Sequence, residues 1–531
     1  MSKEKEAKKE ETVSPPKIDF SKLEIEKLPE IANPEKANTF YKVMKNFVSI
    51  NIKWDEDLKE MVYKVDQPLL SEDEEKSLEQ IKEKIIDTID INIKEKTQQE
   101  SINYLLQKVF DICIQLEIVK KTRLTKQEKI KDEQLLEKLS YYVLRDFIGM
   151  GKIEALLRDQ FIEDLSCDGV NVPIFVLHSK YGPLRTNVIF KDNHELNSFV
   201  MKLAQRCGKY VSFSQPYIDG RLPDGSRVNL TFEHEITTRG STFTIRKFSR
   251  KPLTPLDLVR NGTISERVAA YYWYAVETGV SILVAGSTAS GKTTFLNAIS
   301  FFIPPNSKVI SIEDTRELNL PIENWVPAVE RVGYGPADKY GRRYGEVTMF
   351  ELLKESFRQN PDYVIVGEVR GEEASVLFQG MSSGHACFGT IHADSIKSVV
   401  RRLQLPPINL QADIIDNLDI FTFLLHVKTK KGESRRVVKN VEETTGIDEK
   451  SELKTYSVFL YNPEKDEYEM FEPFKSISQK RGLDNKKVSI EISKREEILK
   501  KMLKHNFNTE QFVKFVHDYY KNPEKTLHEL K

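Results

Sequence analysis

The stretch ILVAGSTASGKTTFLNAI, residues 282–299, decides the fold of the second half of this chain. Its apolar start is typical of a buried strand, a loop flanked by two glycines follows, and helix-forming residues come after the loop. Residues 286–293 match the pattern GxxxxGK[ST], in which the backbone amides of a glycine-rich loop close on phosphate oxygens. The stretch therefore predicts a phosphate-binding loop between a strand and a helix.

The residue types of this loop predict their own roles. Lys292 is expected to reach the β- and γ-phosphates, and Thr293 is expected to ligate Mg²⁺. The cofactors implied are ATP and Mg²⁺. The residues that we expect to hold the nucleotide are Gly286, Ser287, Thr288, Ala289, Ser290, Gly291, Lys292, Thr293 and Thr294.

Two further apolar runs end in carboxylates. KVISIEDTREL (308–318) ends its apolar part at Glu313, and PDYVIVGEVRG (361–371) does so at Gly367 and Glu368. Ligands of doubly wound sheets lie beyond the carboxyl ends of the strands, so both glutamates are expected to face the phosphates. A common P-loop enzyme has an aspartate for Mg²⁺ at the end of the third run, where this chain has Gly367.

A fourth run, SSGHACFGTIHADS (382–395), carries one histidine on each side of its apolar centre. A lone histidine is more often structural than functional. His392 follows the apolar residues, however, so it would lie at the same edge as the two glutamates. We therefore expect His392, rather than His385, to contact the γ-phosphate.

Phosphoryl transfer also needs positive charge around the transferred group, and an arginine supplied from outside the loop can raise the rate by about 10³ to 10⁵. The segment GRLPDGSRVN (220–229) carries Arg221 and Arg227 on a predicted strand-turn-strand. By themselves these would be ordinary surface arginines.

The texture of the sequence changes along the chain and predicts several regions. Residues 1–38 are rich in lysine and glutamate and are expected to be a disordered charged tail, because they have too little apolar surface to offset the entropy of ordering. Residues 39–151 show a short strand signal and then helical periodicity, with a capping box at Ser71 and Glu74, and predict a helical accessory domain. Residues 152–250 alternate strand and helix signals and predict an α+β domain.

The second half is predicted in the same way. Residues 251–263 contain Pro252 and Pro255 and are expected to be a linker. Residues 264–445 alternate strands and helices, which indicates a mostly parallel sheet covered on both faces. Residues 446–531 are mixed and end in two amphipathic helices.

The composition excludes several classes of protein. The 531 residues include 80 Lys and Arg against 81 Asp and Glu, and this balance argues against a dedicated nucleic-acid binder. Four cysteines lie far apart without a CxxC pair, which fits a reducing cytoplasm and offers no zinc site. The start of the chain is hydrophilic and no apolar run reaches the length of a membrane span, so any membrane role is expected to be peripheral, through a partner.

The phosphate loop and the segments 308–318, 361–371 and 382–395 follow one another along the chain. In this order they resemble the motifs of the secretion ATPase superfamily of type II secretion, type IV pili and related machines. In that family a Gly-Glu pair, as at residues 367–368, is typical in place of the usual Asp-Glu. The segments GRLPDGSRVN, TTRGSTFTIRKFS and PLTPLDL are similar to its archaeal branch, which holds the archaellum motor ATPase and the archaeal pilus and secretion ATPases. The resemblance is strong over about residues 150 to 450 and weaker on both sides.

This resemblance implies the fold and the chemistry. It implies a RecA-like P-loop motor domain of the α/β class, and a homo-hexamer of two-domain subunits with ATP between the domains. Arg221 and Arg227, and more weakly Arg246, would complete the site from the N-terminal side. Glu313 would activate the attacking water, Glu368 would hold Mg²⁺ through water, and His392 would sense the γ-phosphate.

The implied machine hydrolyses ATP at the inner face of the cell membrane. It would push or rotate a polytopic membrane platform protein and act indirectly on pilin- or archaellin-like subunits, without direct contact with nucleic acid. The linker after residue 251 would absorb the domain movement.

Other functions stay open. One is a conjugation, DNA-uptake or pilus-retraction ATPase of the same superfamily. Another is a nucleotide-gated scaffold with little turnover, and a third is a small-molecule kinase, for which no acceptor pocket can be recognised in the sequence.

Overall fold

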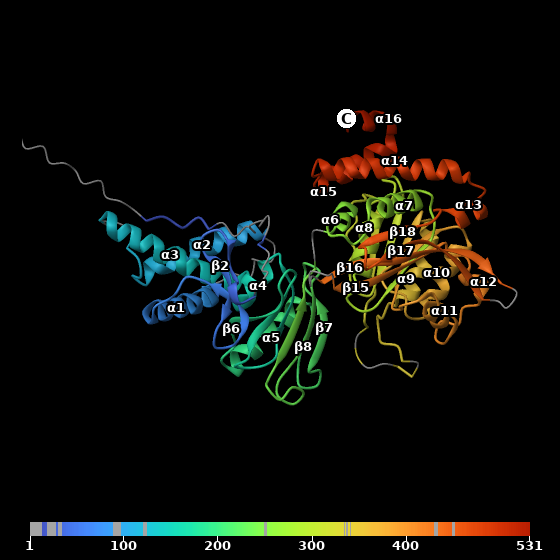
Figure 1. Cartoon of the computed structure of the whole chain (residues 1–531). Helices are drawn as coiled ribbons and strands as arrows, with labels where there is room; N and C mark the ends of the chain where they lie inside the picture. Colours follow the sequence, from blue (N-terminus) through green and yellow to red (C-terminus); the bar gives the residue numbers. More distant parts are fainter. Residues whose placement is uncertain are drawn as a thin grey trace, which may run out of the picture. The chain divides into compact units, whose positions relative to one another are not determined.

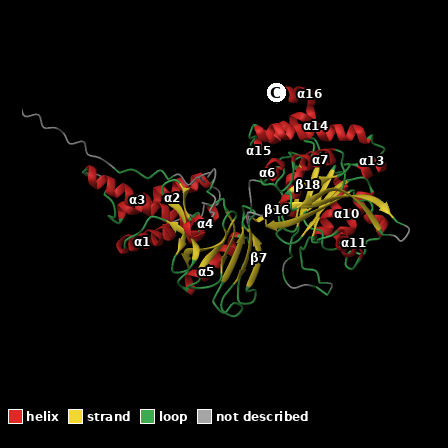
Figure 2. Cartoon of the chain, in the orientation of Figure 1, coloured by secondary structure: helices red, strands yellow, loops and turns green. Residues whose placement is uncertain are grey.

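The computed structural model describes residues 13–18, 28–29, 34–88, 97–120, 125–248, 252–333, 335, 338–339, 341–428, 434–448 and 452–530. The chain divides into two compact units, Met1–Phe248 and Ser249–Lys531 (Figure 1). Each unit has its own large sheet (Figure 2). The fold is thus of the mixed α/β class that the sequence predicts, with the P-loop in the second unit.

The sheet of the first unit has the strand order β1-β2-β3-β6-β5-β4-β9-β8-β7. Its strands are β1 (Asn38–Met44), β2 (Val48–Asp55), β3 (Glu60–Asp66), β4 (Ile162–Cys167), β5 (Pro173–His178), β6 (Gly182–Ile189), β7 (Tyr217–Arg221), β8 (Arg227–Thr231) and β9 (Thr242–Arg246). Neighbouring strands are antiparallel except β3 and β6, which run parallel. The sheet therefore joins the first three strands to the later six.

The helices of the first unit share one apolar core with this sheet. They are η1 (Pro34–Lys36), α1 (Glu72–Thr88), α2 (Gln98–Gln115), α3 (Lys126–Phe147), η3 (Gly151–Ile153), α4 (Glu154–Arg158) and α5 (Asn193–Arg206). The predicted capping box forms at the start of α1, where Ser71 and Glu74 exchange hydrogen bonds. Because α1–α3 and α5 bury their apolar faces in the same cluster, residues 39–151 are not the separate accessory domain that their helical periodicity predicted.

The predicted disordered tail differs from the expectation where the structure describes it. Val13, Ile18 and Leu28 are buried in the core of the first unit. The carbonyl of Leu28 accepts a hydrogen bond from Lys180 Nζ at 2.7 Å, and that of Pro29 accepts one from Tyr181 Oη at 2.7 Å. A few apolar residues in a charged segment are thus enough to attach it to the core. The rest of the predicted tail before residue 34 lies outside the described residues.

The sheet of the second unit has the strand order β12-β11-β13-β14-β10-β15-β16-β17-β18. Its strands are β10 (Ile282–Gly286), β11 (Val309–Glu313), β12 (Trp325–Val329), β13 (Tyr363–Val366), β14 (Ala386–Ile391), β15 (Ile420–Lys428), β16 (Ser434–Ile447), β17 (Leu453–Asn462) and β18 (Glu467–Met470). The strands from β12 to β15 in this order are parallel, and β15 to β18 are antiparallel. The sequence therefore predicts the parallel core correctly.

Helices cover both faces of this sheet. They are α6 (Pro255–Arg260), α7 (Glu266–Glu277), α8 (Lys292–Ser300), α9 (Met349–Ser356), η4 (Phe357–Gln359), α10 (Glu373–Ser382), α11 (Ile396–Gln404), α12 (Ala412–Ile415), α13 (Lys475–Arg481), α14 (Asn485–Lys504), α15 (Thr509–Lys521) and α16 (Pro523–Glu529). Along β10, Ile282 and Val284 pack with α7, α8, α14 and α15, whereas Leu283 and Ala285 pack with α9, α10 and α11. This alternation is what a strand covered on both faces requires.

Two predicted boundaries in the second half are not structural boundaries. Residues 251–263 were predicted as a linker, but Thr254 caps α6, and Leu256 and Leu258 are buried in the core of the second unit. Residue 251 of this predicted linker lies outside the described part. The predicted border at residue 445 falls inside β16, because β16–β18 continue the sheet and α14 packs along α7 (Figure 1).

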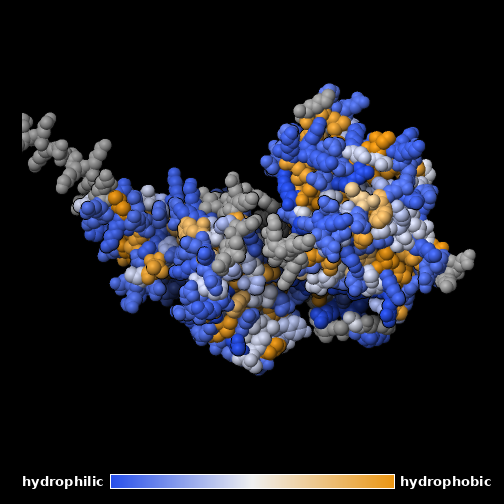
Figure 3. All heavy atoms as spheres, viewed as in Figure 1, coloured by the Kyte–Doolittle hydropathy of each residue, from blue (hydrophilic) through white to orange (hydrophobic). Residues whose placement is uncertain are grey.

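On the face shown in Figure 3, hydrophilic side chains dominate and apolar ones form small scattered groups. Within the described ranges, no helix combines the length and the apolar character that crossing a membrane requires.

Candidate active site

Four parallel strands of the second unit end side by side, and each end carries a predicted site residue. In the order β11-β13-β14-β10, Ile312 pairs with Val366, Val366 with Gly389, and Ile391 with Ala285. The residues that follow these pairs are Glu313, Gly367, His392 and Gly286. Since the strands are parallel, their carboxyl ends share one edge of the sheet. The fold thus brings the predicted motifs together.

The loop from Gly286 to Lys292 has the conformation of an anion cradle. Gly291 has φ +90° and precedes the first helical residue of α8, and Ala289 has φ +60°. A Cβ at Gly286 would lie 2.5 Å from Ser290 Oγ and 2.9 Å from the carbonyl oxygen of Leu424, so only glycine fits there. The loop therefore ends on the N-terminus of α8, whose free amides favour an anion.

The side chains of the loop differ in exposure. Ser287, Thr288 and Ala289 are exposed, whereas Ser290 is buried and donates its hydroxyl hydrogen to the carbonyl of Ser287. In the first turn of α8, Thr293 is half-buried and Thr294 is exposed. Thr293 therefore has a side chain that solvent and a metal ion could reach.

Lys292, His392 and Glu368 form a chain of contacts. Lys292 Nζ lies 3.0 Å from the carbonyl oxygen of Ser287 and 3.3 Å from His392 Nδ1. His392 Nε2 lies 3.4 Å from Glu368 Oε1. A neutral imidazole with its proton on Nε2 satisfies both contacts, since Nδ1 then accepts from the lysine and Nε2 donates to the carboxylate. Burial and the charge of Lys292 lower the pKa of His392, which favours this neutral form.

Glu313 lies at the end of β11 and is 1% exposed. Its Oε1 accepts hydrogen bonds from the backbone N–H of Glu317 at 2.8 Å and of Leu318 at 3.0 Å. Its Oε2 is buried and has no hydrogen-bond partner among the residues that the structure describes. Burial raises the pKa of Glu313 to about 7, although the two backbone N–H groups act in the opposite direction. The second oxygen is thus an acceptor for which the described residues supply no donor.

Gly367 makes room for Glu313. A Cβ at position 367 would lie 3.0 Å from Glu313 Cγ and 3.4 Å from Glu313 Cβ. The carbonyl of Gly367 accepts a hydrogen bond from Thr390 Oγ1 at 2.7 Å, which ties the end of β13 to β14. The missing side chain at the end of β13, unusual for a generic P-loop enzyme, therefore has a packing reason in this fold.

The three predicted arginines lie in one row, in the first unit. Arg221 of β7 pairs with Arg227 of β8, and Arg227 pairs with Arg246 of β9. Directly opposite residues of antiparallel strands point to the same face of a sheet. The structure thus brings Arg246, the weakest of the three expectations, into the same row as the other two.

Carboxylates offset the charge of this row. Arg227 holds Asp219 in a two-pronged contact, Nε to Oδ1 at 3.1 Å and the second terminal nitrogen to Oδ2 at 2.6 Å. Arg246 Nε lies 3.3 Å from Asp164 Oδ1. These pairs are largely exposed, with 40% of the Arg227 side chain and 64% of the Arg246 side chain open to solvent. Exposed pairs of this kind are weak, so a stronger anion can displace them.

The sequence missed one cation beside the loop. Arg436 of β16 donates a hydrogen bond from Nε to the carbonyl of Ala289 at 3.1 Å. The doublet Arg435–Arg436 at the start of a strand was visible in the sequence. Nothing in the sequence, however, indicated that β16 returns beside the phosphate loop.

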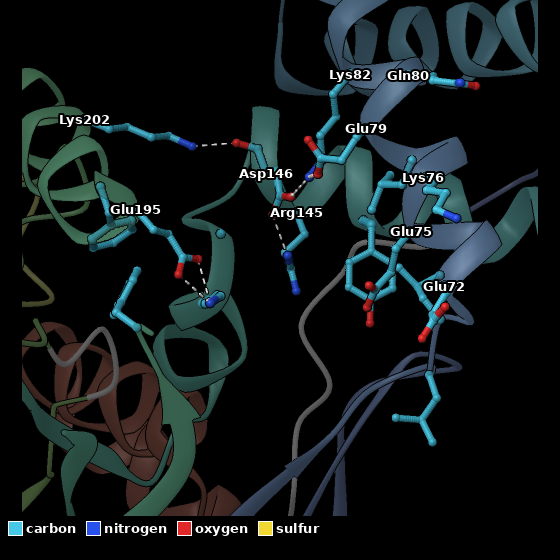
Figure 4. A pocket seen from close by; sticks show the side chains of 18 residues that line it. Glu72, Glu75, Lys76, Glu79, Gln80, Lys82, Arg145, Asp146, Glu195 and Lys202 are labelled. Carbon is cyan, nitrogen blue, oxygen red and sulfur yellow. Dashed lines mark hydrogen bonds and ion pairs between the residues drawn. The ribbon is translucent and has the colours of Figure 1, made fainter. Parts of the chain in front are cut away.

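A separate cleft of about 1220 Å³ lies in the first unit between α1, α3, η3 and α5 (Figure 4). Figure 4 shows Glu72, Glu75 and Glu79 on the α1 side, across from Glu195. Glu195 pairs with Lys152 at 2.6 Å. The cleft contains none of the residues predicted to bind the nucleotide.

Known proteins share the sequence features of this chain. Residues 152–417 match the model of a protein family that is described as type II/IV secretion system proteins. An uncharacterized protein of Methanocaldococcus jannaschii is 40% identical over 333 residues, which cover 62% of this chain and 59% of that protein. The chain therefore spans less than two thirds of the length of this relative.

Two further proteins are similar to parts of this chain. The type IV secretion system protein PtlH of Bordetella pertussis is 30% identical over 275 residues, which cover 46% of this chain and 79% of PtlH. The ATPase DotB of Yersinia pseudotuberculosis is 15% identical in a structural match with a TM-score of 0.41, covering 70% of this chain and 92% of DotB. The family match spans half of this chain and includes both the arginine row and the phosphate loop, and the chain therefore belongs to the family of type II/IV secretion system proteins.

Proposed function

We propose that this chain is an ATP hydrolase that drives a type IV pilus-like, archaellum or secretion machine. One observation carries the proposal: a glycine cradle, a lysine and two carboxylates meet where four parallel strands end, and one oxygen of the buried Glu313 has no partner within the described part of the chain. A buried carboxylate oxygen without a partner costs free energy, which is typical of a functional site.

The residues of this edge fit a nucleoside triphosphate with Mg²⁺. The loop offers backbone amides and the N-terminus of α8 to phosphate oxygens, and Lys292 lies beside them. Thr293 has an accessible hydroxyl for the metal ion, and Glu368 is half-buried near Lys292 and His392, where it could hold the ion through water. Bound ATP and Mg²⁺ would supply the labile phosphate bond and neutralise its charge.

The chain's own residues would then perform distinct tasks. Glu313 Oε2 accepts the proton of the attacking water, and its pKa of about 7 suits a base at neutral pH. His392 senses the γ-phosphate through its contact with Lys292. Arg221, Arg227 and Arg246 of the first unit neutralise developing charge, as the open row of guanidinium groups allows.

The same arginines would couple chemistry to movement. When phosphate leaves, the row loses the anion that it had gained in place of Asp219 and Asp164, so the two units lose a reason to stay together. Residues 252–263 belong to the second unit, so they would move with it rather than absorb the movement.

The assembly that uses this movement is proposed from the family. Six copies would form a ring at the cytoplasmic face of the membrane and act on a polytopic platform protein, and through it on pilin- or archaellin-like subunits. We expect no direct contact of this chain with nucleic acid. PtlH, with which the chain shares 30% identity, is named as part of a type IV secretion system, which supports a role in transport across a membrane.

An ATPase assay on the full chain tests the proposal. We expect the protein to release phosphate from ATP with Mg²⁺, and Lys292→Ala to abolish both nucleotide binding and release. Lys397→Ala on α11 removes an exposed lysine of the same unit and is the matched control. A wild-type protein that binds no nucleotide, or a Lys292→Ala variant that hydrolyses ATP at the wild-type rate, would refute the proposed function.

A further inference from the structure

We propose that Arg436 is a nucleotide-positioning residue, which fixes the crest of the phosphate loop from within the same subunit and adds a second cation beside the phosphates. The inference rests on the proposed function, since it concerns the same site. It goes beyond it because none of the four motifs contains this arginine.

The strand geometry explains how Arg436 reaches the loop. β10 ends at Gly286, which pairs with Leu424 of β15. β15 continues past this point, and its next residues pair with the start of β16, where His426 lies opposite Arg436. Two residues of strand advance about 7 Å. The β15–β16 hairpin therefore extends beyond the carboxyl end of β10, and Arg436 lies beside the loop that follows it.

The face of β16 is the correct one. Arg436 and Val438 are two residues apart, so they point to the same face of the sheet. Val438 packs in the apolar cluster that contains Phe295 and Leu296 of α8. Arg436 is thus on the face that α8 covers, level with the N-terminus of that helix.

Two contacts hold the loop in shape. Arg436 Nε donates to the carbonyl of Ala289 at 3.1 Å, and Ala289 has the left-handed φ of +60° that non-glycine residues rarely adopt. Arg436 Cδ lies 3.1 Å from the position of a Cβ at Gly291. The arginine therefore stabilises the strained residue of the crest and fills the space that the glycine leaves.

The charge of Arg436 is available for a ligand. The side chain is exposed, and within the described ranges its only hydrogen bond is the one to Ala289, so its terminal nitrogens keep their N–H groups. The neighbouring Arg435 differs, because it contacts both Asp466 and Tyr461. Of this doublet, Arg435 has a structural role, and Arg436 faces an anion site with donors to spare.

The position of Arg436 complements that of Lys292. In the sheet, β14 and β15 are the two neighbours of β10. His392 follows β14 and contacts Lys292 on one side of the loop, whereas Arg436 comes from the β16 side. The phosphate loop is thus bracketed by a cationic group on each side, and both groups belong to one subunit.

The expected kinetic effect follows from this position. Arg436 contacts the loop and not the atoms at Glu313, so it should stabilise bound nucleotide in the ground state and the transition state equally. Loss of uniform binding raises KM and leaves kcat almost unchanged. Loss of one hydrogen bond to a charged group corresponds to about a tenfold or larger change in affinity.

The test compares four proteins: wild type, Arg436→Ala, Arg436→Lys and the control Lys439→Ala. Lys439 is exposed on the same strand, and its removal lowers the net charge by the same amount. We measure the Kd for fluorescent ATP and ADP with Mg²⁺, the KM and kcat of hydrolysis, and the thermal unfolding midpoint. Arg436→Ala should raise Kd and KM about tenfold with kcat within about twofold and the midpoint unchanged. Arg436→Lys, which keeps the charge without the planar fork, should recover part of the affinity.

The outcomes separate this inference from the proposed function. If wild type binds and hydrolyses ATP but Arg436→Ala behaves like Lys439→Ala, the positioning role is wrong and the proposed function stands. A loss of kcat with unchanged KM would also overturn the positioning role. If wild type binds no nucleotide, both proposals fall together. If Arg436→Ala unfolds at a lower midpoint and Arg436→Lys does not separate affinity from stability, Arg436 is a structural residue only.

Discussion

The strand-end site of the second unit and the arginine row of the first unit both gather charge, but they do so in opposite ways. In the second unit, Glu313 and Lys292 are almost fully buried, at 1% and 7% exposure. Glu313 ends β11, whereas Lys292 begins α8. In the first unit, Arg227 is half-buried and Arg246 is exposed, and the two lie opposite each other on adjacent antiparallel strands.

The difference reflects the two kinds of sheet. Parallel strands end at one edge, so side chains from several motifs meet there and lose water together. On antiparallel strands, directly opposite residues form a row across one face of the sheet. Here solvent screens the repulsion between the arginines, and nearby carboxylates pair with them. Burial raises the pKa of Glu313, whereas Arg227 and Arg246 form partly exposed ion pairs with Asp219 and Asp164. The first arrangement suits chemistry, and the second suits a contact that must form and break.

The largest expected effect breaks the chemistry of the buried site. Glu313→Gln keeps the acceptor for the N–H groups of Glu317 and Leu318 but removes the base, so kcat should fall by roughly 10³-fold while ATP stays bound. Single-turnover hydrolysis and nucleotide affinity measure the two parts. Glu323→Gln, at an exposed glutamate of the same unit, is the control. A near-normal rate for Glu313→Gln would remove Glu313 from the mechanism.

The next effect tests the exposed row. Arg227→Ala should lower kcat roughly 100-fold, because a lost arginine contact acts on the transition state, with a much smaller change in the Kd for ATP. The stability of the first unit should change by no more than about 1 kcal/mol, since the pair with Asp219 is exposed. Arg185→Ala, on β6 of the same sheet, is the matched control. Equal rates for the two variants would separate the row from catalysis.

The pH dependence sharpens the contrast between buried and exposed charge. Because burial raises the pKa of Glu313 to about 7, the base is protonated below that pH, and kcat should fall about tenfold from pH 8 to pH 6. A rate that is flat over this range, with binding unaffected, would contradict an active base with this pKa.

Stability should change with pH in the opposite sense. Between the ordinary value of 4.5 and about 7 the folded state binds the Glu313 proton more tightly than the unfolded state, so its contribution to stability is present at low pH and is lost as the pH rises. From pH 5.5 to pH 8, wild type should lose about 2 kcal/mol more of its free energy of unfolding than Glu313→Gln does. Denaturant unfolding at the two pH values measures this difference, and identical pH profiles for the two proteins would show that the carboxyl is not perturbed.

The smallest effect concerns the packing behind the base. Gly367→Ala introduces a Cβ 3.0 Å from Glu313 Cγ, so the carboxylate must shift by a few tenths of an ångström. We expect kcat to fall about fivefold with unchanged nucleotide affinity. Gly384→Ala, at a loop glycine whose Cβ would meet nothing within 4 Å, is a control for an added methyl group, although its φ of +88° costs some stability. An unaffected rate for Gly367→Ala would mean that Glu313 tolerates this movement.

Much of the site could be predicted because its motifs are local. The spacing of Gly286, Gly291 and Lys292 reports the shape of one loop, and the apolar runs before Glu313 and His392 report strands that end where polar residues begin. Parallel topology then places these ends at one edge. The alternation of strands and helices predicted the α/β class for the same reason.

The boundaries could not be predicted in this way. The helical periodicity of residues 72–147 describes α1 and α3 correctly, but it does not reveal that β1–β3 join the sheet of β4–β9 through the pair β3–β6. Likewise Pro255 marks a break in sequence, yet it is the first residue of α6, where a proline fits because its missing N–H needs no partner. Long-range pairing leaves no local signal.

The sequence by itself determined the phosphate loop, the parallel core around it and the identity of the charged residues, because each depends on neighbours within about one strand and one helix. Only the tertiary structure decided that the missing side chain of Gly367 leaves room for Glu313 and that three arginines share a row. The same holds for the hydrogen bond from Arg436 to the carbonyl of Ala289. The first and the last of these relations join residues 54 and 147 positions apart, and the arginine row joins three separate strands. All three relations exist only once the strands have paired in their register.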